Sequence, residues 1–73
     1  MSDARFSLLI SDFFNLYNGA AERVGGDPRG VAATCRRSLA VLRAYKPAND
    51  GQEILIETAI EQFEELLRKA GGR

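Results

Sequence analysis

This chain of 73 residues contains no histidine, no tryptophan and a single cysteine, Cys35. One cysteine excludes a disulfide within the chain, and without histidine the chain lacks the nitrogen and sulfur ligands that a structural zinc site requires. A catalytic thiol needs a neighbouring base, which is most often histidine. We therefore expect Cys35 to be a small buried side chain, and we expect no metal, no cofactor and no enzymatic activity.

Long hydrophobic runs and a basic leader are also lacking. The most apolar stretch spans residues 8–18, and polar residues interrupt it at Asp12, Asn15 and Asn18. A transmembrane helix needs about 20 mostly apolar residues, and a secretory signal places positive charge ahead of an apolar run. The sequence thus predicts a soluble protein, and a lone cysteine is typical of the reducing cytoplasm.

Three stretches carry apolar side chains with the period of an amphipathic helix. Their expected bounds are residues 3–24, 28–46 and 51–70. Gly25 and Gly26 are expected to end the first helix through a residue in the left-handed conformation. The expected core consists of Phe6, Ile10, Phe13, Tyr17, Ala20, Val24, Val31, Cys35, Ser38, Leu42, Tyr45, Ile56, Ala59, Ile60, Phe63, Leu67 and Ala70, flanked by Leu9, Phe14, Leu16, Ala21, Leu39, Val41, Leu55 and Leu66.

Polar residues and prolines mark the ends of the second and third helices. Asp27 is a candidate N-cap, and Pro28 fits the first helical position, where its missing N–H has no cost. Pro47 forces the second helix to end shortly before it. Asp50 followed three residues later by Glu53 has the spacing of a capping box at the start of the third helix.

Short connections between amphipathic helices favour antiparallel neighbours. We therefore predict one all-α domain over residues 1–73, folded as a small up-down-up three-helix bundle; a helical hairpin with an extra arm is the alternative architecture. Below about 70–80 residues a single core rarely supplies more than roughly 3–5 kcal/mol. Since residues 3–24 carry a wide apolar arc, completion of the core by self-association is part of this prediction.

The ten acidic and ten basic residues cancel in number but are unevenly distributed. The second predicted helix carries five cations and no acid, whereas the third is mainly acidic. The simplest interpretation is pairing between these antiparallel neighbours; an acidic protein partner and nucleic acid are the alternatives. A helix-turn-helix is disfavoured, because its recognition helix would present glutamates to DNA phosphates. The expected pairs join Arg36, Arg37 and Arg43 to Glu53, Glu57, Glu61 or Glu64.

Two further features are candidates for a partner-binding surface. Leu8 and Ile54 lie opposite the apolar stripes of their helices and at the same end of the predicted bundle, so we hypothesise a shared apolar patch. Alanines on the outer face of the second helix either allow another helix to approach closely or act only as strong helix formers. With the basic residues between them, the candidates are Leu8, Ile54, Ala33, Arg36, Arg37, Ala40, Arg43 and Ala44.

These features favour a small, non-enzymatic, regulatory module for protein–protein interaction. It would present a helical surface to a protein partner, as an adaptor, an inhibitor or an accessory subunit. One alternative is a structural homo-oligomer, a homodimer in its simplest form, whose helices pack against copies of themselves. Another is nucleic-acid binding through the basic helix over residues 28–46. Neither a membrane nor a small-molecule substrate is expected as a partner.

Overall fold

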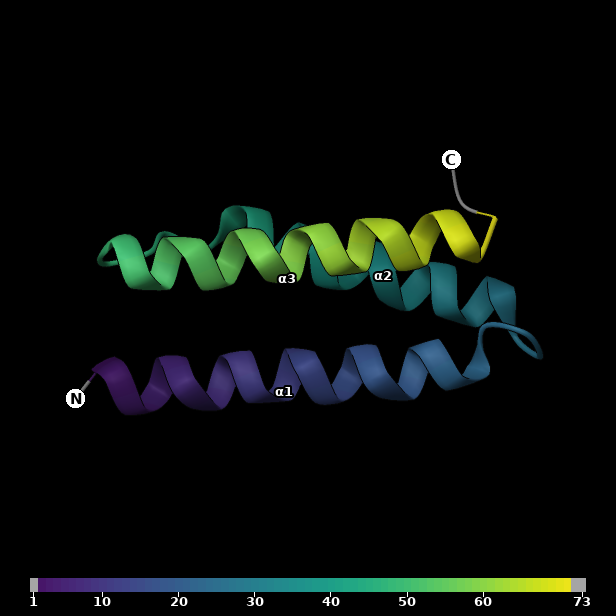
Figure 1. Cartoon of the computed structure of the whole chain (residues 1–73), viewed down its shortest axis with the longest axis horizontal. Coiled ribbons are helices and arrows are strands. Elements are labelled where there is room, and N and C mark those ends of the chain that lie inside the picture. Colours follow the sequence, from purple (N-terminus) through teal and green to yellow (C-terminus); the bar gives the residue numbers. More distant parts are fainter. Residues whose placement is uncertain (1, 72–73) are drawn as a thin grey trace.

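The computed structural model describes residues 2–71 and consists of three α-helices (Figure 1). They are α1 (Ser2–Arg23), α2 (Pro28–Ala44) and α3 (Asp50–Lys69). α1 and α3 run in the same direction and α2 runs in the opposite one. The predicted all-α, up-down-up bundle is confirmed, and each helix end lies within two residues of its expected position.

The three helices do not pack equally. α2 and α3 pack most extensively against each other, while α1 makes fewer contacts with both. The molecule is elongated and thin, with extents of 39 × 20 × 14 Å. Over the part of the chain that the structure describes, each helix is too short or too polar to cross a membrane.

An aromatic cluster around Phe63 forms the centre of the core. This ring is fully buried, and the rings of Phe13 and Tyr17 from α1 meet it edge-on at centroid distances of 6.2 and 5.8 Å. A second aromatic pair joins Phe6 to Tyr45 at 5.7 Å and links the start of α1 to the residue after α2. The buried apolar residues are Phe6, Ile10, Ala20, Val31, Ala32, Cys35, Leu39, Leu42, Ile56, Ala59, Phe63 and Leu66.

Some residues expected to flank the core are misplaced by the sequence prediction. Leu16, Val41 and Leu55 are exposed, whereas Leu66 is buried. The reason is clearest in α2, which packs mainly against α3 and turns its buried arc that way. Leu39 lies on the flank facing α3 and is buried. Val41, about 200° further around the helix, lies on the opposite flank and is exposed to solvent.

The start of α2 matches its prediction, but the end of α1 does not. The amide of Gly30 donates a hydrogen bond of 3.1 Å to Oδ1 of Asp27, the N-cap. α1 ends in a turn in which the amide of Asp27 donates to the carbonyl oxygen of Arg23 at 2.7 Å. Within residues 2–71 the left-handed conformation occurs only at Gly71, with a φ of 83°, so the expectation for the glycines after α1 is wrong.

The cap of α3 lies one residue before the predicted position. Oδ1 of Asn49 accepts a hydrogen bond of 2.9 Å from the amide of Gln52, and Oε1 of Gln52 accepts one of 2.9 Å from the amide of Ala48. This is a variant of the capping box in which the glutamine reaches the residue before the cap. Gln52 is buried, and burying a neutral amide costs less than burying a carboxylate such as that of Glu53. The predicted Asp50–Glu53 box is therefore replaced by Asn49 and Gln52.

Truncating the cap tests this assignment. Asn49→Ala is expected to lower the free energy of unfolding by about 1 kcal/mol, because the amide of Gln52 loses its acceptor. Asp50→Ala removes only a favourable interaction with the helix dipole, which salt of about 0.5 M largely screens. Urea titrations followed by circular dichroism at that salt concentration should rank Asn49→Ala clearly below Asp50→Ala. A lower stability for Asp50→Ala than for Asn49→Ala would instead support Asp50 as the N-cap.

Candidate functional site

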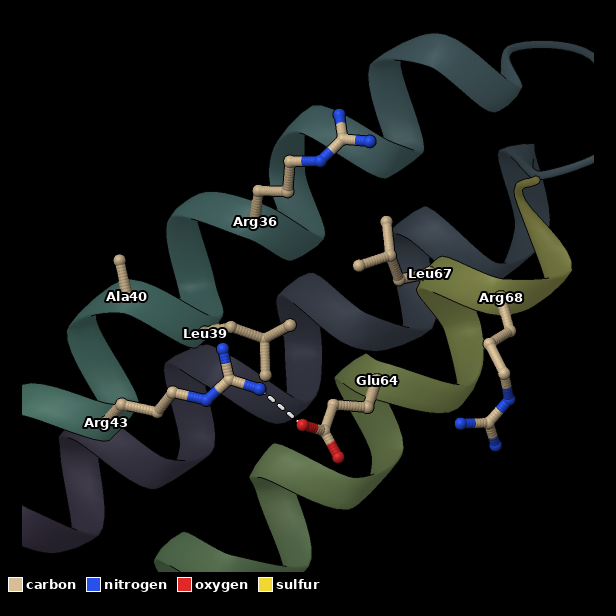
Figure 2. Close-up of a pocket in the computed structure, with 7 residues that line it drawn as sticks. All are labelled: Arg36, Leu39, Ala40, Arg43, Glu64, Leu67 and Arg68. Atoms are coloured by element: carbon tan, nitrogen blue, oxygen red, sulfur yellow. Dashed lines mark hydrogen bonds and ion pairs between the residues drawn. The ribbon is translucent and has the colours of Figure 1, made fainter. Parts of the chain in front are cut away.

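A groove of about 740 Å³ lies between α2 and α3 (Figure 2). Leu39 from α2 and Leu67 from α3 point into the space between the helices, and we call these two side chains the groove floor. Three arginines stand around them, namely Arg36, Arg43 and Arg68, which we call the rim arginines. Ala40 and Glu64 complete the lining.

One ion pair spans the groove. Arg43 of α2 is paired with Glu64 of α3, and the two side chains are 56% and 41% exposed (Figure 2). Exposed pairs stabilise a fold by only about 0.2–1 kcal/mol, so this one orients the two helices more than it holds them together. Arg36 and Arg68 direct their guanidinium groups outward from the edges of the groove. The groove thus combines an apolar floor with an excess of positive charge.

The expected row of ion pairs between α2 and α3 is wrong apart from Arg43–Glu64. Among residues 4–71, whose side chains the structure describes, neither Arg36 nor Arg37 makes an ion pair. α2 ends at Ala44, and an extended connection runs on to the start of α3 (Figure 1). The N-terminal half of α3 therefore has this connection beside it where the prediction placed the cations of α2.

The groove gathers three of the eight candidate residues, Arg36, Ala40 and Arg43. The rest of the α2 set lies outside it. Ala33 is half-buried, and Arg37 and Ala44 are exposed.

Leu8 and Ile54 are exposed as predicted, at 67% and 62%. Each belongs to the first two turns of its helix, and α1 and α3 start at the same end of the bundle (Figure 1). Each lies about 160° from the centre of the core-facing stripe on its own helix. Side chains that point directly away from a shared core diverge from one another. The structure does not bring these two residues together.

The α3 side of the groove consists of Glu64, Leu67 and Arg68. Glu64 was expected to pair with Arg43 and Leu67 to lie in the core, but none of the three was predicted to line a binding site. No local pattern points to this side of the groove, because the offset between two antiparallel helices decides which residues of α3 lie opposite Arg36 and Leu39.

A smaller hollow of about 390 Å³ adjoins the groove where α2 begins and α3 ends. Arg36 lines both. The other lining residues are Pro28, Arg29, Ala32, Ala70 and Gly71.

Cys35 is fully buried in α2, which confirms the expectation of an interior side chain. Burial raises the pKa of its thiol above the ordinary value of 9.0, although the charge of neighbouring Arg36 acts in the opposite direction. A thiol with a raised pKa stays protonated near neutral pH, and the thiolate is the reactive form. In the part of the chain that the structure describes, no three histidine, cysteine, aspartate or glutamate side chains lie close enough to hold a metal ion.

The thiol makes stability depend on alkaline pH in a defined direction. As the pH rises through 9.0, the thiol ionises in the unfolded chain before it does so in the folded one. At neutral pH the thiol is protonated in both states, so its ionisation does not change the free energy of unfolding. Above about pH 9 the free energy of unfolding should fall. Urea titrations from about pH 8 to about pH 10.5 should show a steeper decline for the wild type than for Cys35→Ala. An equal decline of the free energy of unfolding with pH in the two proteins would contradict a raised pKa for the Cys35 thiol.

No protein-family model matches this chain, and it has no significant match among curated proteins or among solved structures. What the groove can bind follows from its own shape and charge. An apolar floor within a basic rim fits a ligand that combines a large apolar side chain with carboxylates.

Proposed function

We propose that this chain is a non-enzymatic protein-interaction module that binds an acidic, amphipathic helical segment in the groove between α2 and α3. The observation that carries the proposal is the groove floor of Leu39 and Leu67 surrounded by the three rim arginines. Burying one large apolar side chain against such a floor supplies about 1.5–3 kcal/mol. The rim arginines select the charge of the partner and speed its approach.

The shape of the site favours a helix as the bound element. Both walls are α-helices whose lining residues recur at intervals of three and four, as in grooves that receive the apolar face of a partner helix. Glu64 lies inside the groove, and further glutamates follow along α3. The apolar floor distinguishes a peptide from a nucleic acid as the ligand, because a leucine side chain of a peptide can cover Leu39 and Leu67, whereas a phosphate backbone offers no apolar group to them.

Fluorescence anisotropy with an acidic probe tests the proposal. The probe is a fluorescein-labelled helical peptide composed of glutamate, alanine and leucine, with leucines along one face. We expect saturable binding at low salt, because the leucines cover the groove floor while the glutamates face the rim arginines. Arg36→Glu should weaken binding about fivefold to tenfold, whereas Arg37→Glu, its neighbour outside the groove, should leave binding nearly unchanged.

Two controls separate groove binding from general electrostatics. A second peptide with serine in place of leucine should bind far more weakly, and duplex DNA should not displace the first peptide. Equal losses for Arg36→Glu and Arg37→Glu, or no binding of the first peptide, would overturn the proposal.

A further inference from the structure

α3 itself carries the chemistry that the groove accepts. Ile54 is 62% exposed, although it is a large apolar residue. Asp50, Glu57 and Glu61 lie within about 60° of it around the helix, and all three are exposed. We call these four residues the acidic ridge. Within residues 4–71 none of the three carboxylates of the ridge forms an ion pair, so their charge is available to a partner.

The acidic ridge cannot fill the groove of its own chain. Ile54 and Leu67 belong to the same helix and are thirteen residues apart. At a rise of 1.5 Å per residue this separation is about 20 Å, and the helix holds it fixed. The ridge therefore reaches only the groove of another molecule.

We infer that the partner in the groove is the acidic ridge of a second copy of this chain. The inference rests on the proposed function, because it names the occupant of the same groove. Ile54 of one copy packs on the groove floor of the other, which removes its side chain from water. Asp50 and Glu57, about one turn to either side of Ile54, then lie beside the rim arginines, so charge and apolar surface match together.

When the α3 helices of the two copies lie antiparallel, the ridge of each copy meets the groove of the other, and the dimer closes with two-fold symmetry. A dimer of this kind also suits a chain of 73 residues, because small domains often gain stability from a partner subunit. The contact is small, and part of its strength is electrostatic. It is therefore a reversible association that weakens as salt rises.

A charge swap tests the dimer directly. The groove variant carries Arg36→Glu with Arg68→Glu, and the ridge variant carries Glu57→Lys with Glu61→Lys. Sedimentation velocity from about 5 µM to about 500 µM should show reversible dimerisation of the wild type. Each variant alone should dimerise at least about tenfold more weakly, because like charges then face each other. An equimolar mixture should recover association, because both contacts of the mixed dimer are complementary again.

Matched variants control for net charge and for folding. Arg37→Glu and Glu22→Lys are exposed reversals outside the groove and the ridge, and they should leave dimerisation nearly unchanged. Circular dichroism melts of every variant show whether the helices are intact before association is compared.

The outcomes separate this inference from the proposed function. A wild type that stays monomeric up to the highest concentration overturns the dimer, and so does a mixture of the two variants that fails to associate. If the chain is monomeric but still binds the acidic peptide through Arg36, the groove remains a protein-binding site and only the second copy is overturned. If neither association is seen, both proposals are wrong. A dimer that persists in both variants places the contact elsewhere and also overturns the inference.

Discussion

Phe63→Ala is expected to leave the chain largely unfolded at room temperature. The Phe63 ring is fully buried and lies against the rings of Phe13 and Tyr17. Replacing a buried phenylalanine by alanine costs about 3–5 kcal/mol, because apolar area is lost and a cavity remains. A single core of this size supplies roughly 3–5 kcal/mol in total, so the loss is comparable to the whole stability of the fold.

Urea titration followed by circular dichroism measures this effect. Phe63→Leu keeps most of the volume and should retain a cooperative transition at lower urea. Leu8→Ala is the surface control, since that side chain is 67% exposed, and it should change the free energy of unfolding by less than about 0.5 kcal/mol. A loss of under about 1 kcal/mol for Phe63→Ala would mean that the aromatic cluster is not the centre of the core.

Leu42→Ala and Val41→Ala are expected to differ sharply although the two residues are neighbours in sequence. Leu42 is 1% exposed and Val41 is 52% exposed. Truncating the buried leucine should cost about 2–5 kcal/mol. Truncating the exposed valine should have an effect near zero, because alanine is the better helix former and little packing is lost.

The same urea titrations decide between two orientations of α2. Comparable losses at both positions would mean that the flank of α2 with Val41 is buried, next to the core where the sequence pattern placed it. A large loss at Leu42 alone supports the orientation in which α2 faces α3 and leaves the flank with Val41 open. The comparison therefore also tests whether the groove between α2 and α3 has the walls described here.

The central stripes of the three helices could be predicted from sequence because their period depends only on local geometry. Cys35, Leu42 and Phe63 were expected in the core and are buried there. Whether a residue at the edge of a stripe is buried depends on the position of the neighbouring helices, and the local sequence pattern does not give that position. Val41 and Leu66 lie at such edges, and both were misplaced.

Helix caps show a similar limit. Asp27 has no competitor at the start of α2, and it was identified correctly. Before α3 two candidate pairs stand one residue out of register, Asn49 with Gln52 and Asp50 with Glu53. Burial decides between the two pairs. The side chain at position 52 points toward the core, where an uncharged glutamine costs less to bury than a carboxylate. Gln52 lies four residues before Ile56, on the buried face, and this periodicity is the signal that favours the Asn49 pair.

The candidate site was only half visible in the sequence. A run of cations without acids pointed to α2, and two of its arginines do line the groove. The α3 wall depends on the offset between the two helices, which follows from where α2 ends and how the extended connection runs. Of the two exposed aliphatic residues, Ile54 has a proposed role in the dimer because carboxylates of the acidic ridge lie beside it. Leu8 has no such group of charges around it.

Amide NMR spectra of the wild type, recorded from dilute to concentrated solution, test most directly whether the α2/α3 face is the contact surface. We expect shifts that grow with concentration at residues 36–43, 54–61 and 64–68, while the outer face of α1 stays unchanged. The Arg36→Glu, Arg68→Glu variant should lose these shifts. Spectra that do not change with concentration, or shifts centred on the face of α1 that carries Leu8, would contradict this account.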